Sequence, residues 1–176
     1  LDILVHAVAF ANKDDLKGEF MSVSREGFLL AQDVSAYSLV ALAREARPLI
    51  SDGGTLNTLS YYGAEKAVAN YHVMGVAKAS LEACVRYLAV DLGKEGIRVN
   101  AISAGPVRTL SASGVSGFKK MHRLFEQISP MRRPLSIDDL GNSAVYLCSE
   151  MSRGTTGEIH YVDGGYNIIG VPEVVD

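Results

Sequence analysis

Apolar residues recur along the chain in two patterns, which predict strands and helices in alternation. Short runs that are continuously apolar, or that alternate apolar and polar residues, are typical of the strands of a largely buried sheet. Longer stretches with apolar residues three and four positions apart are typical of helices that bury one face. The strands predicted in this way are residues 1–9, 55–61, 97–105 and 157–165, and the helices are residues 24–50, 73–96 and 136–150.

The alternation of strands and helices indicates repeated βαβ units. It predicts an α/β fold with a doubly wound parallel sheet and helices on both faces. We expect a single domain over residues 1–176 with no linker, and a first strand that is covered on both faces. Residues 107–135 are expected to form a loop with a short helix, and Ser136 is expected to cap the helix that follows.

Four strands are fewer than the six or more of a complete nucleotide-binding sheet, whose first strand is normally followed by a Gly-rich turn. No G-x-G-x-x-G pattern occurs in the sequence. Either the chain is an unusually small α/β domain, or it corresponds to the C-terminal portion of a Rossmann-like sheet whose first strands and Gly-rich turn lie upstream of Leu1.

The overall charge argues against some classes of partner. The net charge of −3 provides no large positive field for nucleic acid or for an anionic membrane surface, and no apolar run approaches the length of a membrane span. The two cysteines, Cys84 and Cys148, lie in predicted helices without metal-ligand spacing. This arrangement favours reduced, buried thiols, no metal site and a cytoplasmic location.

A stretch rich in tyrosine and lysine, SYYGAEKAVANYHVMGVAKAS, joins the second predicted strand to the next helix. Within it, Tyr62 and Lys66 have the Tyr-x-x-x-Lys spacing of most short-chain dehydrogenases, in which positions i and i+4 share a helix face. Tyr62, however, lies just beyond the strand, before the helical pattern becomes strong. We therefore interpret Tyr62 as aromatic packing at a strand end.

Tyr71 and Lys78 form the alternative pair. A step of seven residues returns to nearly the same face of a helix with a rise of about 10 Å, which a lysine side chain and a bound ribose together can span. An isolated Tyr-x6-Lys pattern is weak, and chance explains such a match more readily than function does.

Around this pair the chain resembles the enoyl-acyl carrier protein reductases of bacterial type II fatty acid synthesis, a divergent branch of the short-chain dehydrogenases. Tyr61, Tyr71 and Lys78 match the family spacing Tyr-x9-Tyr-x6-Lys, and AGPVRTLSASG is similar to its substrate-binding loop. The resemblance extends from HAVAFA to VDGGY. It implies reduction of the trans-2 double bond of enoyl thioesters in fatty acid elongation, with NADH or NADPH as cofactor.

The resemblance also implies a role for each residue. Tyr71 would stabilise the enolate at the thioester oxygen, with its pKa lowered by the ammonium of Lys78, and Lys78 would bind the nicotinamide ribose. Tyr61 corresponds to the second active-site tyrosine, Lys119 and Lys120 resemble the docking site for the acidic acyl carrier protein, and a homotetramer is implied. The other residues assigned are Val8, Val107, Arg108, Thr109, Leu110 and Ser111 for the cofactor and Ala11, Met74 and Phe118 for the substrate.

Two other functions remain as alternatives. A carbonyl-reducing short-chain dehydrogenase would need a catalytic serine upstream of its tyrosine, where Asn57 and Thr58 stand in this sequence. A non-catalytic scaffold on the same fold would keep its role without Tyr71. Comparing the reduction of crotonyl and acetoacetyl thioesters distinguishes an enoyl reductase from the first alternative. The effect of Tyr71→Phe on the biological role distinguishes an enzyme from the second.

We predict that the 176 residues by themselves have negligible affinity for NADH. The resemblance places the Gly-rich turn and the acidic residue that recognises the adenosine in strands preceding this segment, so only half of the dinucleotide cleft is expected here. A fluorescence titration of the 176-residue chain with NADH measures the affinity directly, and a micromolar dissociation constant would contradict the prediction.

Overall fold

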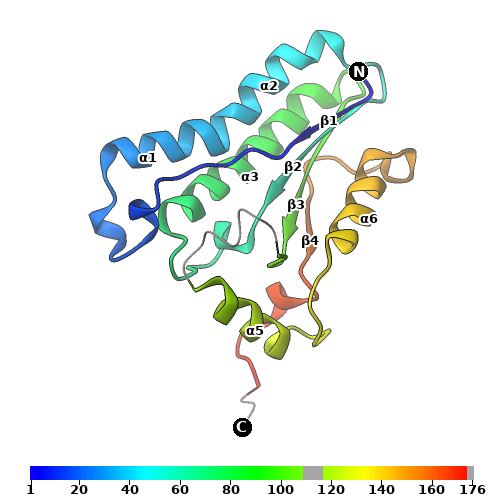
Figure 1. Cartoon of the computed structure of the whole chain (residues 1–176). Coiled ribbons are helices and arrows are strands. Elements are labelled where there is room, and N and C mark those ends of the chain that lie inside the picture. Colours follow the sequence, from blue (N-terminus) through cyan, green and yellow to red (C-terminus); the bar gives the residue numbers. More distant parts are fainter. Residues whose placement is uncertain (109–116, 174–176) are drawn as a thin grey trace.

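A computed structural model of the chain, which describes residues 1–108 and 117–173, has a parallel sheet of four strands (Figure 1). The strands lie in the order β1-β2-β3-β4, and each pairs in parallel with its neighbour in the sequence. Every predicted strand is therefore present, and the predicted α/β architecture is confirmed. The strands are β1 (Ile3–His6), β2 (Thr55–Ser60), β3 (Arg98–Ala104) and β4 (Ile159–Val162).

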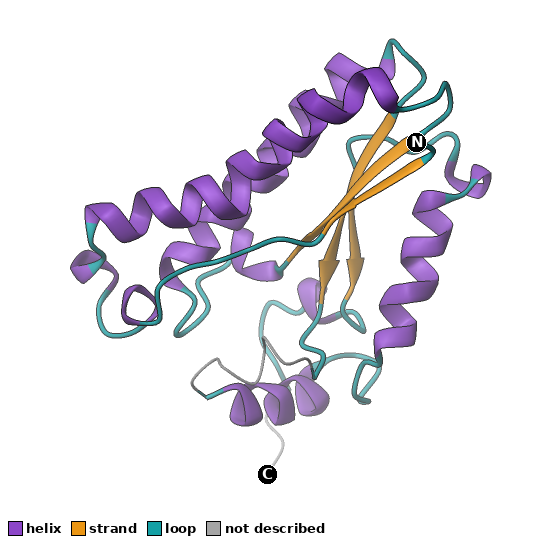
Figure 2. Ribbon diagram, turned by 45° about the horizontal axis from the view of Figure 1, so that its top comes forward, coloured by secondary structure: helices purple, strands orange, loops and turns teal. Residues whose placement is uncertain are grey.

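Helices cover both faces of the sheet, as the βαβ pattern predicts (Figures 1 and 2). On one face, α3 packs against β3 and against the helical segment that contains α1 and α2, whereas α6 packs against β2, β3 and β4 on the other face. A further helix, α5, lies beyond the carboxyl ends of the strands. The helices are α1 (Arg25–Gln32), α2 (Ser38–Ala46), α3 (His72–Gly93), α5 (Phe118–Ile128) and α6 (Ile137–Cys148).

The helix predicted over residues 24–50 contains one π turn, Asp33–Tyr37, between α1 and α2. Within this turn the Ser35 hydroxyl accepts a hydrogen bond from the backbone N–H of Phe10 and donates one to the carbonyl of the same residue. The π turn therefore holds the chain segment that leaves β1.

The core lies between the sheet and the long helices. Leu56 of β2, Val99 of β3, Leu39 of α2 and Leu81 and Val85 of α3 are fully buried and form one cluster. On α3 the buried side includes Leu81 and Val85, whereas the apolar Tyr87 and Val90 are exposed, so the periodicity predicts the helix but not which of its sides is buried. Because strands and helices share this cluster, the ends of β2 and α3 are held in a fixed relation.

The expectation that the first strand is covered on both faces is wrong. Leu4 packs against the core and His6 is buried, but Ile3 and Val5, on the opposite face of β1, are 45% and 53% exposed. The physical reason is that α6 packs against the other three strands, so its cover of that face does not include β1. A continuous apolar run therefore describes a strand with one buried face here.

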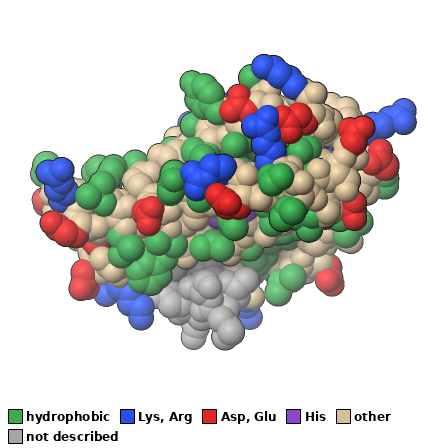
Figure 3. Space-filling model, turned by 90° about the horizontal axis from the view of Figure 1, so that it is seen from above, with side chains coloured by type: hydrophobic (Ala, Val, Ile, Leu, Met, Phe, Trp, Pro, Cys, Tyr) green, Lys and Arg blue, Asp and Glu red, His purple; other side chains and the backbone are tan. Residues whose placement is uncertain are grey.

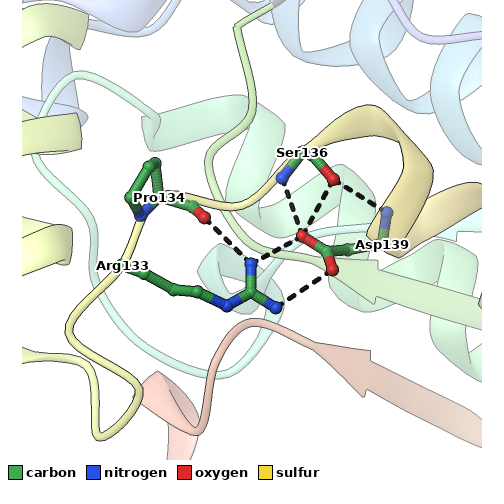
Figure 4. Close-up of polar contacts among 4 residues, drawn as sticks. All are labelled: Arg133, Pro134, Ser136 and Asp139. Atoms are coloured by element: carbon green, nitrogen blue, oxygen red, sulfur yellow. Dashed lines mark hydrogen bonds and ion pairs between the residues drawn. The ribbon is translucent and has the colours of Figure 1, made fainter.

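The start of α6 is held as the sequence predicts (Figure 4). Ser136 accepts a hydrogen bond from the backbone N–H of Asp139, and the Asp139 carboxylate accepts from the Ser136 N–H. Arg133 adds a bidentate ion pair, with its Nη1 2.9 Å from the carboxylate. This guanidinium, with the Ser136 bonds, holds the pKa of Asp139 well below its usual range.

Hydrophobic and charged side chains mix on the surface seen from above, where groups of both signs are interspersed (Figure 3). Among the described residues, no helix is both long enough and apolar enough to cross a membrane. The two cysteines are free thiols and partly buried, as their positions in apolar helical patterns predict.

Candidate active site

Tyr61 and Tyr71 of the Tyr-x9-Tyr-x6-Lys spacing meet beyond the carboxyl end of β2, and Lys78 is hydrogen-bonded to the end of the same strand. Tyr61 directly follows β2, Tyr71 directly precedes α3, and their rings lie 4.9 Å apart in an edge-to-face contact. Lys78 lies inside α3, 7% exposed, and its Nζ donates a hydrogen bond of 2.7 Å to the carbonyl of Leu59 in β2. One strand end and one helix start therefore bring together three residues that the sequence separates.

Local backbone features explain the position of Tyr71. Asn70 adopts a left-handed conformation with φ of 59°, which asparagine tolerates better than most residues, and the helix begins two residues later. A Cβ on Gly75 would lie 2.7 Å from the carbonyl oxygen of Gly63, and one on Gly63 would lie 2.5 Å from Tyr71 Cδ1. The two glycines therefore allow the loop after β2 to approach α3 and the Tyr71 ring closely.

Both tyrosines remain protonated at neutral pH. Burial raises the pKa of Tyr61 to about 12, with a smaller contribution from Tyr166. Burial also raises the pKa of Tyr71 well above its usual value, and Tyr61 raises it further. The expectation that the pKa of Tyr71 is lowered is wrong, because burial disfavours the charged phenolate. Each phenol is thus a hydrogen-bond donor.

Lys78 is a buried cation whose ammonium makes one hydrogen bond within the part of the chain that the structure describes. Burial lowers its pKa to about 8, and the nearby Glu82 carboxylate opposes that shift. An ammonium has three N–H donors, of which the Leu59 carbonyl takes one. The other two can serve hydroxyl groups of a ligand.

The residues assigned to the substrate lie beside the tyrosines where the structure describes them. Met74 and Tyr71 belong to an apolar cluster at the start of α3, and Ala11 packs against the same cluster from the segment after β1. The side chain of Phe118 lies outside the described residues.

Tyr61 also faces α5. Its hydroxyl donates to the sulfur of Met121 at 3.5 Å, and a cavity of about 30 Å³ lies between these residues and Phe125. The ring of Phe125 in turn contacts Tyr166, in the segment after β4. The wall of the site opposite α3 is therefore built from α5 and the C-terminal segment.

Tyr62 packs against the C-terminal segment, as its position at a strand end predicts. The Tyr62 hydroxyl donates to the carbonyl of Asn167 at 3.1 Å, and its ring contacts Tyr161 and Tyr166 edge-on. Lys66 is exposed. Tyr62 thus anchors the C-terminal segment to the loop after β2.

The residues assigned to the cofactor occupy the ends of β1 and β3. Val8 follows β1 and is about half exposed, and Val107 and Arg108 follow β3. Lys120, assigned to carrier-protein docking, is exposed on α5. Thr109, Leu110 and Ser111 lie outside the described residues, as does the side chain of Lys119.

The sequence reading missed two polar residues beside the site. Glu82 is buried on α3 one turn after Lys78, and the Ser60 hydroxyl donates a 2.5 Å hydrogen bond to its carboxylate. The signal was available, because Glu82 stands four positions after Lys78 in KASLEACVRY, inside the apolar stripe of the helix.

Comparison with known sequences identifies the family. The family profile described as Enoyl-(Acyl carrier protein) reductase matches residues 1–167. The chain belongs to the enoyl-acyl carrier protein reductase family. It is 58% identical over 167 residues to the protein of Bacillus cereus named enoyl-acyl-carrier-protein reductase (NADH) FabI, covering 95% of this chain and 65% of that relative. The protein of the same name from Escherichia coli K12 is 53% identical over 174 residues, which cover 98% of this chain and 66% of the relative.

Solved structures agree with these sequence relatives. The Bacillus cereus enoyl-acyl carrier protein reductase with NADP+ and indole naphthyridinone has a TM-score of 0.95 at 57% identity, covering 97% of this chain and 66% of that one. The reductase of Anaplasma phagocytophilum in complex with NAD has a TM-score of 0.94 at 54% identity, covering 99% and 66%. The chain therefore spans about two thirds of the length of the relatives it matches.

Proposed function

We propose that this chain carries the catalytic residues of an NADH-dependent enoyl-acyl carrier protein reductase. The observation that supports this most directly is the meeting of Tyr61, Tyr71 and a buried Lys78 at the end of β2, in a member of this family. The relatives are named for NADH, while the related Bacillus cereus structure contains NADP+, so NADPH is retained as a second cofactor. The location proposed is the cytoplasm, since free, partly buried thiols suit a reducing compartment.

The described residues fit the nicotinamide end of such a cofactor. Lys78 keeps two N–H donors that can bind the hydroxyls of a ribose. Val8 and Val107 follow the carboxyl ends of β1 and β3, the edge at which ligands bind in open α/β sheets. When bound, the reduced nicotinamide supplies the hydride that adds to C3 of the enoyl thioester.

Tyr71 would act on the substrate side of the reaction. Negative charge builds on the thioester oxygen as the enolate forms, and a protonated phenol donates a hydrogen bond to that oxygen. The raised pKa of Tyr71 favours this role, because burial keeps the proton on the phenol. Tyr61 lies in edge contact with it, with its hydroxyl donating to the sulfur of Met121, while Ala11 and Met74 offer an apolar surface to the acyl chain.

We predict that Tyr71→Phe lowers kcat for crotonyl thioester reduction by about 100-fold or more with little change in KM, because one donor to the developing oxyanion is lost. Tyr62→Phe is the matched control and should leave kcat nearly unchanged. NADH consumption is measured on a chimera that adds the portion of the Bacillus cereus relative outside the 167 aligned residues. Equal rates for the two variants, or preferential reduction of an acetoacetyl thioester, would contradict the proposal.

Lys119 and Lys120 on α5 are proposed to dock the acyl carrier protein. Lys120 is exposed and α5 borders the site through Met121, so an acidic partner held there would deliver its thioester close to the tyrosines.

Charge reversal tests this docking surface. Lys120→Glu should raise KM for an enoyl-acyl carrier protein several-fold and weaken its dependence on salt, without changing the rate with crotonyl-coenzyme A. Lys94→Glu, an exposed lysine just after α3, serves as the control. An unchanged KM for the carrier-protein substrate would rule out a docking role for Lys120.

A homotetramer is the proposed assembly. Tyr87 and Val90 on the outer face of α3 are 76% and 65% exposed, and Leu29 of α1 is also exposed. Large apolar residues gathered on long helices favour packing against a second copy.

Val90→Lys should therefore reduce the molar mass measured by light scattering after size-exclusion chromatography, because an unpaired ammonium would be buried between subunits. Leu49→Lys places the same charge at another exposed apolar residue and should leave the mass unchanged. A Val90→Lys protein that keeps the tetramer mass would exclude this face of α3 as an interface.

A further inference from the structure

Glu82 is a buried carboxylate for which the proposed reaction has no direct use. It is 6% exposed on α3, and the Ser60 hydroxyl donates a 2.5 Å hydrogen bond to its Oε1. A buried carboxylate is strongly disfavoured unless it is paired or hydrogen-bonded. An ionised Glu82 carboxylate on the buried side of α3 therefore needs a cation nearby to offset its desolvation.

The end of β2 and one turn of α3 place Lys78 next to this carboxylate. Leu59 and Ser60 are consecutive residues at the end of β2, and they bind two side chains one helical turn apart on α3. The Leu59 carbonyl accepts from Lys78, and the Ser60 hydroxyl donates to Glu82. The strand end thus holds a cation and an anion side by side, each by one hydrogen bond.

The charges that act on Glu82 come from α3 and from the loop after β2. On α3 these are Arg86 and Lys78, which favour its ionised form. Glu65, in the loop after β2, opposes ionisation, and Tyr161 of β4 donates its hydroxyl to the Glu65 carboxylate. Burial raises the pKa of Glu82, and the Ser60 hydrogen bond and the two cations counter that shift.

We propose that Glu82 is a positioning residue of the site, whose carboxylate, anchored by Ser60, keeps the adjacent Lys78 protonated and directed at the end of β2. The proposal rests on the proposed function, in which Lys78 binds the cofactor ribose as a cation. Without the carboxylate, burial would favour a neutral amine at Lys78. A role confined to tying α3 to β2 would need only the hydrogen bond, which a glutamine side chain also accepts.

The pKa of Lys78 tests the proposal without any assay of activity. It is read from the ¹³Cε resonance of Lys78 in protein labelled at lysine, assigned by its loss in a Lys78→Met sample. In the unchanged protein the midpoint should lie near 8, and Glu82→Gln should lower it by about one unit. Glu82→Asp should stay close to the unchanged protein, and Asp91→Asn, an exposed carboxylate on the same helix, should have no effect. An unchanged midpoint in Glu82→Gln overturns the proposal.

A measurement on the unsubstituted protein covers the case in which Glu82→Gln does not fold. The ¹³Cδ resonance of the Glu82 carboxyl group should shift a second time at the pH where Lys78 loses its proton, since the two charges interact. A Glu82 resonance that is insensitive to the titration of Lys78 overturns the proposal without any substitution.

Cofactor binding separates this proposal from the proposed function. With a midpoint lowered from about 8 to about 7, the protonated fraction of Lys78 at pH 8 falls about fivefold, whereas at pH 6 it hardly changes. The affinity of the Glu82→Gln chimera for NADH should therefore fall about fivefold at pH 8 and stay level at pH 6. A lowered Lys78 midpoint in a protein without reductase activity would support the role of Glu82 and refute the reductase. An active reductase in which Glu82→Gln leaves the Lys78 midpoint unchanged would support the reductase function and refute the role of Glu82.

Discussion

The arrangement of this site depends on the hydrogen bond between the buried ammonium of Lys78 and the carbonyl of Leu59. It joins the end of β2 to the second turn of α3, and the two elements also share the apolar core. A charged group is buried only where its desolvation is offset, and the offset here comes from a backbone carbonyl and the neighbouring Glu82. The position of the cation is therefore fixed by the fold before any ligand is present.

Once that link is in place, the tyrosines have little freedom. Gly63 and Gly75 bring the loop after β2 against α3, and the Tyr71 ring is enclosed between them and Tyr61. The same enclosure keeps both phenols protonated and at the same time lowers the pKa of Lys78, because burial disfavours the charged form of each group. One physical cause thus supplies neutral donors and a cation that loses its proton only under mildly alkaline conditions.

The elements of the fold were predictable because they depend on local periodicity and on capping. Ser136 caps α6 as its sequence context indicates, and α3 forms where the apolar periodicity predicts a helix, although the apolar residues Tyr87 and Val90 lie on its exposed face. The exposed face of β1 was not predictable, because Ile3 and Val5 are apolar whether or not another layer covers them. The spacing of Tyr61, Tyr71 and Lys78 pointed to the candidate site, but the spacing carries no information on solvation. The raised pKa of Tyr71 and the pairing of Glu82 with Ser60 therefore emerged only from the structure.

Part of the site is built from residues close together in the sequence, and part from segments far apart in it. Tyr61, Tyr71 and Lys78 belong to one strand, one helix and the loop between them, so their arrangement requires only the packing of α3 on the sheet. The surfaces that would receive a dinucleotide come from chain segments far apart in sequence, at the ends of β1 and β3, and β1 has one uncovered face. A chain that spans about two thirds of the length of its relatives can therefore bring Tyr61, Tyr71 and Lys78 to one strand end by local packing, whereas the surfaces at the ends of β1 and β3 depend on the arrangement of the sheet.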